Sequence, residues 1–205
     1  MKIIYHGHAC FEVVTENGSV VFDPYADGSV RGLRLPELTA DAVICSHSHS
    51  DHNAKDKVRL SGKAPGFELT QLSCFHDEYN GAKRGGNLIS VIEAEGLRLA
   101  HCGDLGHELT PAQLRALGRI DVLMIPVGGF FTVDAVTAKS IADKIDPAII
   151  IPMHYKGDGV GLKNIGECGA FTALYPKDSV KYLDSNEFIL KIPPIPAVTV
   201  FAFPE

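Results

Sequence analysis

Ser46-His47-Ser48-His49-Ser50-Asp51-His52 is the stretch of this sequence that carries the most chemistry. It places three imidazoles and a carboxylate within six consecutive residues, 47–52, and such a dense set of nitrogen and oxygen donors is typical of a metal site. The preceding segment, 41–46, is apolar and partly β-branched, which indicates a buried strand. The donors therefore follow a strand end, where α/β folds place their chemistry. A solvated histidine-rich loop is the alternative, and the position behind a core strand disfavours it.

The spacing within this stretch favours two metal ions over one. His47 and His49 are two residues apart, so both rings point to one side of an extended or tightly turned backbone. We expect Asp51 and His52 to begin a helix over 53–59, because a helix start favours an anionic side chain. One segment then offers two separate pairs of donors.

The amino-acid composition limits the classes of protein to which this chain can belong. The 205 residues are 45% hydrophobic, enough for a substantial core, so we expect one domain over 1–205. The net charge of −6 and the lack of a basic stripe argue against binding to duplex nucleic acid, while a small anionic substrate stays compatible. Neither a signal-peptide core nor an apolar run of about 18 residues is present, so no membrane association is expected. The five scattered cysteines favour a reducing, cytoplasmic setting.

The order of secondary structure predicts two sheets with helices packed outside. The first half is rich in strands, with a hairpin at Glu16-Asn17-Gly18, and its predicted strands cover 3–5, 10–15, 19–23, 42–46, 68–72, 88–93 and 97–102. In the second half, helices are predicted from Pro111, capped by Thr110, and over 133–145. Strands are predicted there over 121–126, 148–152, 179–183 and 188–191. The tail over 197–203 is either an edge strand or a surface strap.

Three further metal-competent side chains directly follow apolar runs. They are His76, Asp104 and His154. Taken singly, each is more often a structural side chain than a metal ligand. Their shared placement after successive strands predicts that they join the donors of 47–52.

The ordered motifs give the sequence a family resemblance. It resembles the metallo-β-lactamase-fold hydrolase superfamily, and within it the small stand-alone Zn-dependent hydrolases, on five motifs that span nearly the whole chain: Asp23-Pro24, His47-x-His49-x-Asp51-His52, His76, Gly103-Asp104 and Pro152-Met153-His154-Tyr155. The resemblance implies a four-layered αβ/βα sandwich, in which two mixed sheets are flanked by helices and the metals lie in a groove at one edge.

The resemblance also implies a ligand assignment. His47, His49 and His76 would hold one metal ion, Asp51, His52 and His154 a second, and Asp104 would bridge the two. Asp23 would orient the ligand loop over 47–52 without itself binding a metal ion. The expected ions are two zinc ions, although a His/Asp set also accepts Mn, Fe, Co or Ni.

The expected activity is hydrolysis of a small-molecule substrate. A metal-bridging hydroxide would attack an ester, lactone, amide or phosphodiester, with Asp51 and Asp104 at the reacting centre and His107 as a candidate proton donor. His8 and the 76–87 loop, with Lys83, Arg84 and Asn87, are candidates for supporting the ligands from behind, lining the groove or binding an anion.

Two alternatives remain open to the sequence. One is a non-catalytic sensor or adaptor that binds a metal or an anion on the same fold. The other is a redox di-iron enzyme. It is disfavoured because oxygen- and nitric-oxide-reducing members of the superfamily carry a glutamate where this sequence has His49.

Overall fold

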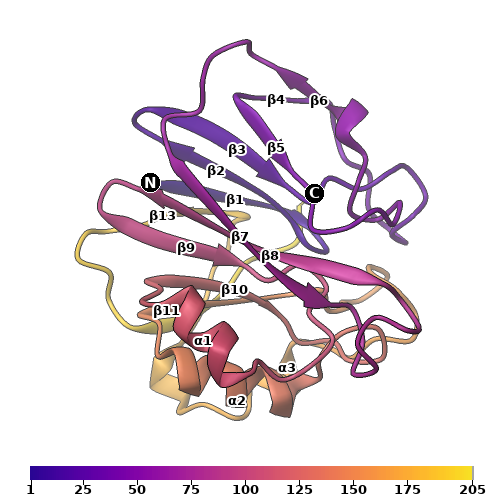
Figure 1. Cartoon of the computed structure of the whole chain (residues 1–205). Helices are drawn as coiled ribbons and strands as arrows, with labels where there is room; N and C mark the ends of the chain where they lie inside the picture. The colour runs from indigo at the N-terminus through magenta and orange to yellow at the C-terminus, as the bar shows by residue number, and fades with distance from the viewer. Residues whose placement is uncertain (205) are drawn as a thin grey trace.

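The computed structural model describes residues 1–204, and its strands form two main sheets (Figure 1). The smaller sheet has the strand order β13-β1-β2-β3-β5. Its strands are β1 (Lys2–Gly7), β2 (Cys10–Thr15), β3 (Gly18–Phe22), β5 (Ala42–Ile44) and β13 (Glu187–Ile189). Strands β2 and β3 pair antiparallel from Thr15 and Gly18 onward, which confirms the predicted hairpin.

The larger sheet has seven strands in the order β12-β14-β11-β10-β9-β8-β7. They are β7 (Glu68–Phe75), β8 (Gly86–Ala94), β9 (Leu97–His101), β10 (Val122–Pro126), β11 (Ile149–Met153), β12 (Val180–Tyr182) and β14 (Ala197–Val200). The run from β12 to β9 is parallel, while β8 and β7 are antiparallel to their neighbours. The larger sheet is therefore mixed, as the smaller one is.

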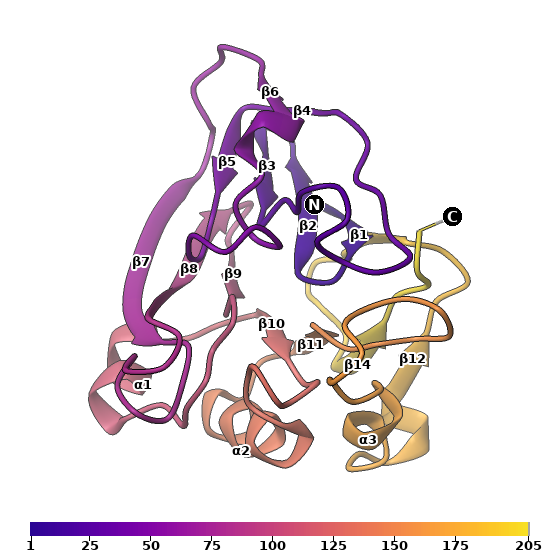
Figure 2. The same ribbon diagram turned by 90° about the vertical axis from the view of Figure 1, so that its right-hand side faces the viewer.

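The helices lie on the outer side of the larger sheet (Figure 2). They are α1 (Pro111–Leu117), α2 (Ala135–Ile145) and the short α3 (Gly169–Thr172). Thr110 caps α1 by accepting from the Gln113 amide, as predicted, and Asp134 caps α2 by accepting from the Thr137 amide. Helix α2 buries Ala138, Ile141 and Ala142. Apolar side chains of both sheets form a common core.

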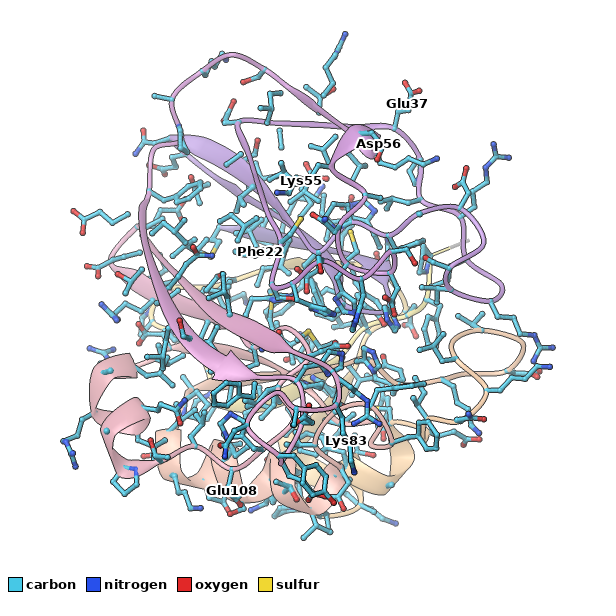
Figure 3. The ribbon with its side chains drawn as sticks, turned by 45° about the vertical axis from the view of Figure 1, so that its right-hand side comes forward. Phe22, Glu37, Lys55, Asp56, Lys83 and Glu108 are labelled. Atoms are coloured by element: carbon cyan, nitrogen blue, oxygen red, sulfur yellow. The ribbon has the colours of Figure 1, made fainter. Side chains whose placement is uncertain are left out.

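The outer face of the smaller sheet is covered differently. Strands β4 (Leu38–Ala40) and β6 (Val58–Leu60), with the 3₁₀ turn Lys55–Lys57, form the cover (Figure 3, where Lys55 and Asp56 lie at the top). The helix predicted over 53–59 is wrong. Val58 lies in strand β6 and is paired with Leu38 of β4, and its side chain is buried in one apolar cluster with Ala40 and Val21. A local charge pattern favoured a helix, but burial of Val58 against a distant strand decides the conformation.

The C-terminal strand is the second correction. The tail was expected to be an edge strand or a surface strap, but β14 lies inside the larger sheet, between β11 and β12. Val198, Thr199 and Val200 are buried there. Among residues 1–204, no helix is long and apolar enough to cross a membrane.

The strand directions bring six chain segments to one side of the molecule. In the smaller sheet β1, β3 and β5 run the same way, because β1 and β3 are both antiparallel to β2 and β5 is parallel to β3. In the larger sheet β7, β9 and β11 also share one direction. The carboxyl ends of the strands within each set therefore lie at one edge of their sheet. The His8 amide oxygen, just after β1, accepts from the amide of His154, just after β11, which joins the two edges.

Candidate metal centre

All seven predicted metal ligands converge where these strand ends meet. His47, His49 and His76 have ligand atoms within 4.8 Å of one another, and so do His47, His52 and Asp104. The imidazoles of His47 and His76 lie 4.7 Å apart between centroids, and those of His49 and His76 5.2 Å apart. The structure thus gathers in one place residues that are up to 107 positions apart, from 47 to 154.

Asp104 lies at the centre of the cluster. Its Oδ2 is 3.2 Å from His76 Nε2, 3.3 Å from His154 Nε2 and 3.9 Å from His47 Nε2. Its Oδ1 is 3.2 Å from His52 Nε2. One carboxylate therefore faces imidazoles of both predicted ligand groups, which is the position a bridging ligand requires.

His8 belongs to the second group more closely than the sequence indicated. Its ligand atom lies within 4.8 Å of those of Asp51, His52 and His154. The His8 ring is buried, its centroid is 4.1 Å from that of His154, and its Nε2 is 3.3 Å from Asp51 Oδ2. The structure therefore places His8 among the candidate ligands of the second group.

Asp23 and Ser46 orient two of the histidines from behind. The Asp23 carboxylate accepts hydrogen bonds from the Ser46 amide (2.6 Å), the Ser46 hydroxyl (2.6 Å) and His52 Nδ1 (2.8 Å). Since the Ser46 hydroxyl donates to Asp23, it accepts from His47 Nδ1 at 2.9 Å. Both histidines then carry their proton on Nδ1 and turn the Nε2 lone pair toward Asp104.

The backbone at the cluster is strained at three strand ends. His8, Asp23 and His154 have φ values of 59°, 44° and 54°, in the left-handed region that side chains with a Cβ rarely adopt. Each such residue costs about 1–3 kcal/mol, and strain of this kind is concentrated at functional sites. Two of the three residues, His8 and His154, are among the candidate ligands.

The protonation states suit metal binding. Burial, with the neighbouring charge of His52, lowers the pKa of His47 to about 4, and burial with the charge of His154 lowers that of His8 to about 4. Burial alone would lower the pKa of His52, but Asp104 and Asp23 raise it well above its usual range. A positive charge is therefore stabilised at His52 Nε2, and a metal ion supplies that charge as a proton does.

The cluster leaves polar atoms without partners, and this tests whether the donor set fits a metal. Within residues 1–204, nine buried side-chain nitrogen and oxygen atoms lack a hydrogen-bond partner. Seven of the nine belong to the cluster: His8 Nδ1, His47 Nε2, His52 Nε2, His76 Nδ1, Asp104 Oδ1, His154 Nδ1 and His154 Nε2. Four of the seven, His47 Nε2, His52 Nε2, His154 Nε2 and Asp104 Oδ1, are the atoms by which these side chains face one another. Buried polar atoms are normally satisfied, so such a concentration of donor atoms fits divalent cations.

Comparison with known proteins identifies the family. The model of the beta-lactamase superfamily domain matches residues 2–154. A crystal structure from Thermotoga maritima, named as a Zn-dependent hydrolase of the metallo-beta-lactamase superfamily, has a TM-score of 0.75 and 34% identity over 98% of this chain and 97% of its own. The chain belongs to the metallo-β-lactamase superfamily.

A curated relative and a more distant solved structure are also similar to this chain. A UPF0173 metal-dependent hydrolase of Thermoplasma acidophilum is 30% identical over 76% of this chain and 83% of its own length. A metal-dependent hydrolase structure from Parabacteroides distasonis, at 18% identity, shares the fold with a TM-score of 0.67 over 98% of this chain and 93% of its own. The αβ/βα sandwich inferred from the motifs is thereby confirmed.

Asn87 supports this metallo-β-lactamase centre and does not face the groove. Its Oδ1 accepts from the Asp104 amide at 3.0 Å, and its Nδ2 donates to the Cys102 carbonyl at 2.8 Å and to Cys74 Sγ. Asn87 is buried. Of the two roles that the sequence left open for Asn87, supporting the centre or binding substrate, these contacts favour the first, because they fix the backbone that carries Asp104.

Gly103 is needed at its position for two reasons, its φ of 53° and its closeness to Ser46 and Asn87. A Cβ there would lie 2.3 Å from Ser46 Cβ and 2.5 Å from Asn87 Oδ1. We expect Gly103→Ala to displace both supports and to weaken metal binding by about 10–100-fold, measured by chelator competition. Gly96→Ala is the matched control, since it has a φ of 73° but open space around it. Equal metal affinity in the two variants would contradict the prediction.

A groove of about 240 Å³ opens over the centre. It is lined by His49, Asp51, His76, Arg84, Asp104, Phe131, His154 and Leu162. The Asp51 side chain is 20% exposed there, while Asp104 is buried beneath. Burial alone would raise the pKa of Asp51, but the hydrogen bond from His8 and the charge of His52 lower it below its usual range.

The structure does not bring His107 to this groove. Its Nδ1 donates to the Glu108 carbonyl at 2.7 Å, and its Nε2 accepts from the Phe75 amide at 3.1 Å. It lines a separate hollow with Gly129 and Asp134. Both ring nitrogens are engaged with backbone, so the proposed role as proton donor to a leaving group is withdrawn.

Lys83 and Arg84, adjacent in sequence, differ in placement. Lys83 is exposed, its Nζ lies 3.6 Å from the centre of the Tyr79 ring, and it lines a neighbouring hollow (Figure 3 shows it on the same half of the molecule as Glu108). Arg84 lines the groove itself. Of the two cationic candidates, only Arg84 reaches the candidate site.

Sequence reasoning missed three contributors. Ser46 orients His47, Leu162 lines the groove, and Asp77 organises the loop that carries Arg84. Asp77 accepts four backbone N–H donors, from residues 79, 81, 83 and 84, which lower its pKa to about 2 against the effect of burial. An aspartate followed by a Gly-containing loop is a signal for such a turn. Leu162 had no signal, because its position depends on tertiary packing.

Proposed function

We propose that this chain is a hydrolase that depends on two divalent metal ions, zinc by preference. The observation that carries the proposal is the convergence of the imidazoles around the Asp104 carboxylate with seven unpartnered buried polar atoms. His47, His49 and His76 would hold one ion, and Asp51, His52 and His154, with His8 beside them, would hold the other. The names of the relatives, metal-dependent and Zn-dependent hydrolases, support the same activity.

The ions would supply the reactive chemistry, since divalent cations acidify a water molecule and polarise the oxygen of the bond to be cleaved. The residues of the protein would orient the metal ligands and the attacking water. Asp23 and Ser46 hold His52 and His47 with Nε2 toward the site. Asp51, partly exposed in the groove, is placed to accept a proton or to orient the attacking water. His8 keeps the Asp51 carboxylate in place through its Nε2 contact.

The substrate we propose is a small molecule that contains an ester, lactone, amide or phosphodiester group. The groove of about 240 Å³ suits one small ligand, and its single Lys/Arg side chain, Arg84, favours an anionic one. We also propose that the chain acts as one hydrolase domain over 1–205 in the reducing cytoplasm. The five cysteines are all free.

Metal removal tests this proposal. We expect the protein as purified, or loaded with Zn²⁺ or Mn²⁺, to bind about two ions per chain by elemental analysis. It should hydrolyse at least one class in a panel of para-nitrophenyl esters, lactones and phosphodiesters. Chelation should abolish turnover and lower the melting temperature, since ions that bind only the folded state stabilise it. Stoichiometric metal without turnover on any class would favour the non-catalytic sensor, and no bound metal would refute the proposal.

A further inference from the structure

Arg84 is a cation without a carboxylate partner in the part of the chain that the structure describes. Among residues 1–204, no salt bridge involves it, and its side chain makes one hydrogen bond, from Nη2 to the Phe130 carbonyl at 2.9 Å. A guanidinium has five N–H donors in a planar fork. Most of its donor capacity is therefore available to a ligand in the groove.

The surroundings hold this guanidinium in place. The Arg84 amide donates to Asp77 at 2.7 Å, which fixes the backbone. The guanidinium carbon lies 5.5 Å from the centre of the Phe131 ring, within cation–π range. Phe130, which receives the hydrogen bond, has a φ of 61°, a conformation that is costly for a bulky residue. Arg84 is thus positioned before any ligand binds, which lowers the entropic cost of binding.

The groove around Arg84 combines this cation with an apolar wall. Phe131 and Leu162 are its apolar lining residues, both half-buried, and Arg84 is its only Lys or Arg. Lys83 is held over the Tyr79 ring and does not line the groove. The one permanent positive charge of Arg84 balances the single negative charge of a carboxylate or a phosphodiester better than the double negative charge of a phosphate monoester.

We propose that Arg84 selects substrates that carry one singly charged oxyanion beside an apolar body. The oxyanion, a carboxylate or a phosphodiester, is bound by the free edge of the guanidinium, and the apolar body packs on Phe131 and Leu162. The inference rests on the proposed hydrolase, because it names the substrate class of the same groove.

A matched pair of esters tests the charge preference. Mono-para-nitrophenyl glutarate and para-nitrophenyl valerate differ only in a terminal carboxylate against a methyl group. We expect kcat/KM to favour the glutarate in the metal-loaded wild type, and Arg84→Met to reduce it on the glutarate by about tenfold or more, mainly through KM. On the valerate, the change should stay within about twofold. Arg84→Lys should recover part of the loss, because it keeps the charge and loses the fork.

Lys83→Met is the control for charge in the same loop, and it should behave as the wild type on both esters. Metal content and melting temperature of all variants report whether the loop has merely become disordered. Equal losses of kcat/KM on both esters in Arg84→Met would overturn the proposal. So would a loss of kcat/KM that is larger in Lys83→Met than in Arg84→Met.

Ligand binding without turnover separates this inference from the proposed function. Calorimetry with benzoate, and separately with dimethyl phosphate, should show that Arg84→Met weakens at least one of them about tenfold relative to wild type and Lys83→Met. The ligand that is weakened identifies the oxyanion. If no class of the substrate panel is hydrolysed but this difference is found, the hydrolase proposal fails and the anion site stands. Unchanged affinity for both anions overturns the inference, whatever the activity.

Discussion

Asp104→Asn is expected to give a protein that folds but binds no more than one metal ion and has lost its hydrolytic activity by more than about 100-fold. The reason is geometric, since the two Asp104 oxygens face four imidazole Nε2 atoms at 3.2–3.9 Å. An amide has the same shape but supplies no charge and only one acceptor oxygen. Elemental analysis and turnover on the ester panel measure the two effects.

Asp121→Asn is the matched control for this variant. Asp121 is also buried, but it accepts from the Arg98 amide and from Arg119 far from the cluster. We expect it to lose some thermal stability and to keep its metal. If Asp104→Asn retained two ions and full activity, the bridging position proposed for Asp104 would be wrong.

Asp23→Ala is expected to produce the second largest effect, on both stability and metal affinity. It leaves the Ser46 amide, the Ser46 hydroxyl and His52 Nδ1 without their acceptor in a fully buried setting. Each unsatisfied group costs about 1–3 kcal/mol, so the free energy of unfolding should fall by about 3 kcal/mol or more. His52 and His47 also lose their orientation, which should weaken metal binding by about 10–100-fold.

Denaturant unfolding and chelator competition measure these changes separately. Asp134→Ala removes another carboxylate that accepts from backbone, at the exposed N-cap of α2, and should cost about 1 kcal/mol without affecting the metal. A loss of metal affinity no greater in Asp23→Ala than in Asp134→Ala would show that Asp23 does not orient the ligands.

The candidate ligands were largely predictable from sequence because their signal is local. An apolar run followed at once by a histidine or aspartate marks a strand end, and this pattern located His76, Asp104 and His154 as well as the 47–52 stretch. The role of His107 was misjudged for the opposite reason, and the sequence left open whether Asn87 supports the centre or binds substrate. Their hydrogen bonds to Phe75 and Cys102 join segments 32 and 15 residues apart, and no local pattern encodes them.

The errors in the fold have the same origin. The 53–59 segment has helix-like charge, but Val58 completes a small apolar cluster beside Ala40 and Val21, and strand pairing with β4 follows from that burial. The tail was expected at an edge or on the surface, but its Val198 and Val200 are buried in a strand that lies between β11 and β12. Burial against distant partners outweighed propensity in both places.

The sequence by itself determined the kinds of donor, their order along the chain and their places after strands, because alternation and strand ends are written in neighbouring residues. Only the tertiary structure decided that β1, β3, β5, β7, β9 and β11 deliver their ends to one centre, that His8 joins the second ligand group, and that Arg84 faces the groove while Lys83 does not. These outcomes depend on sheet order and on hydrogen bonds between distant segments, such as that of the His154 amide to the His8 carbonyl. Contacts of that kind form when the two sheets pack together, and their energy is absent from any short stretch of chain.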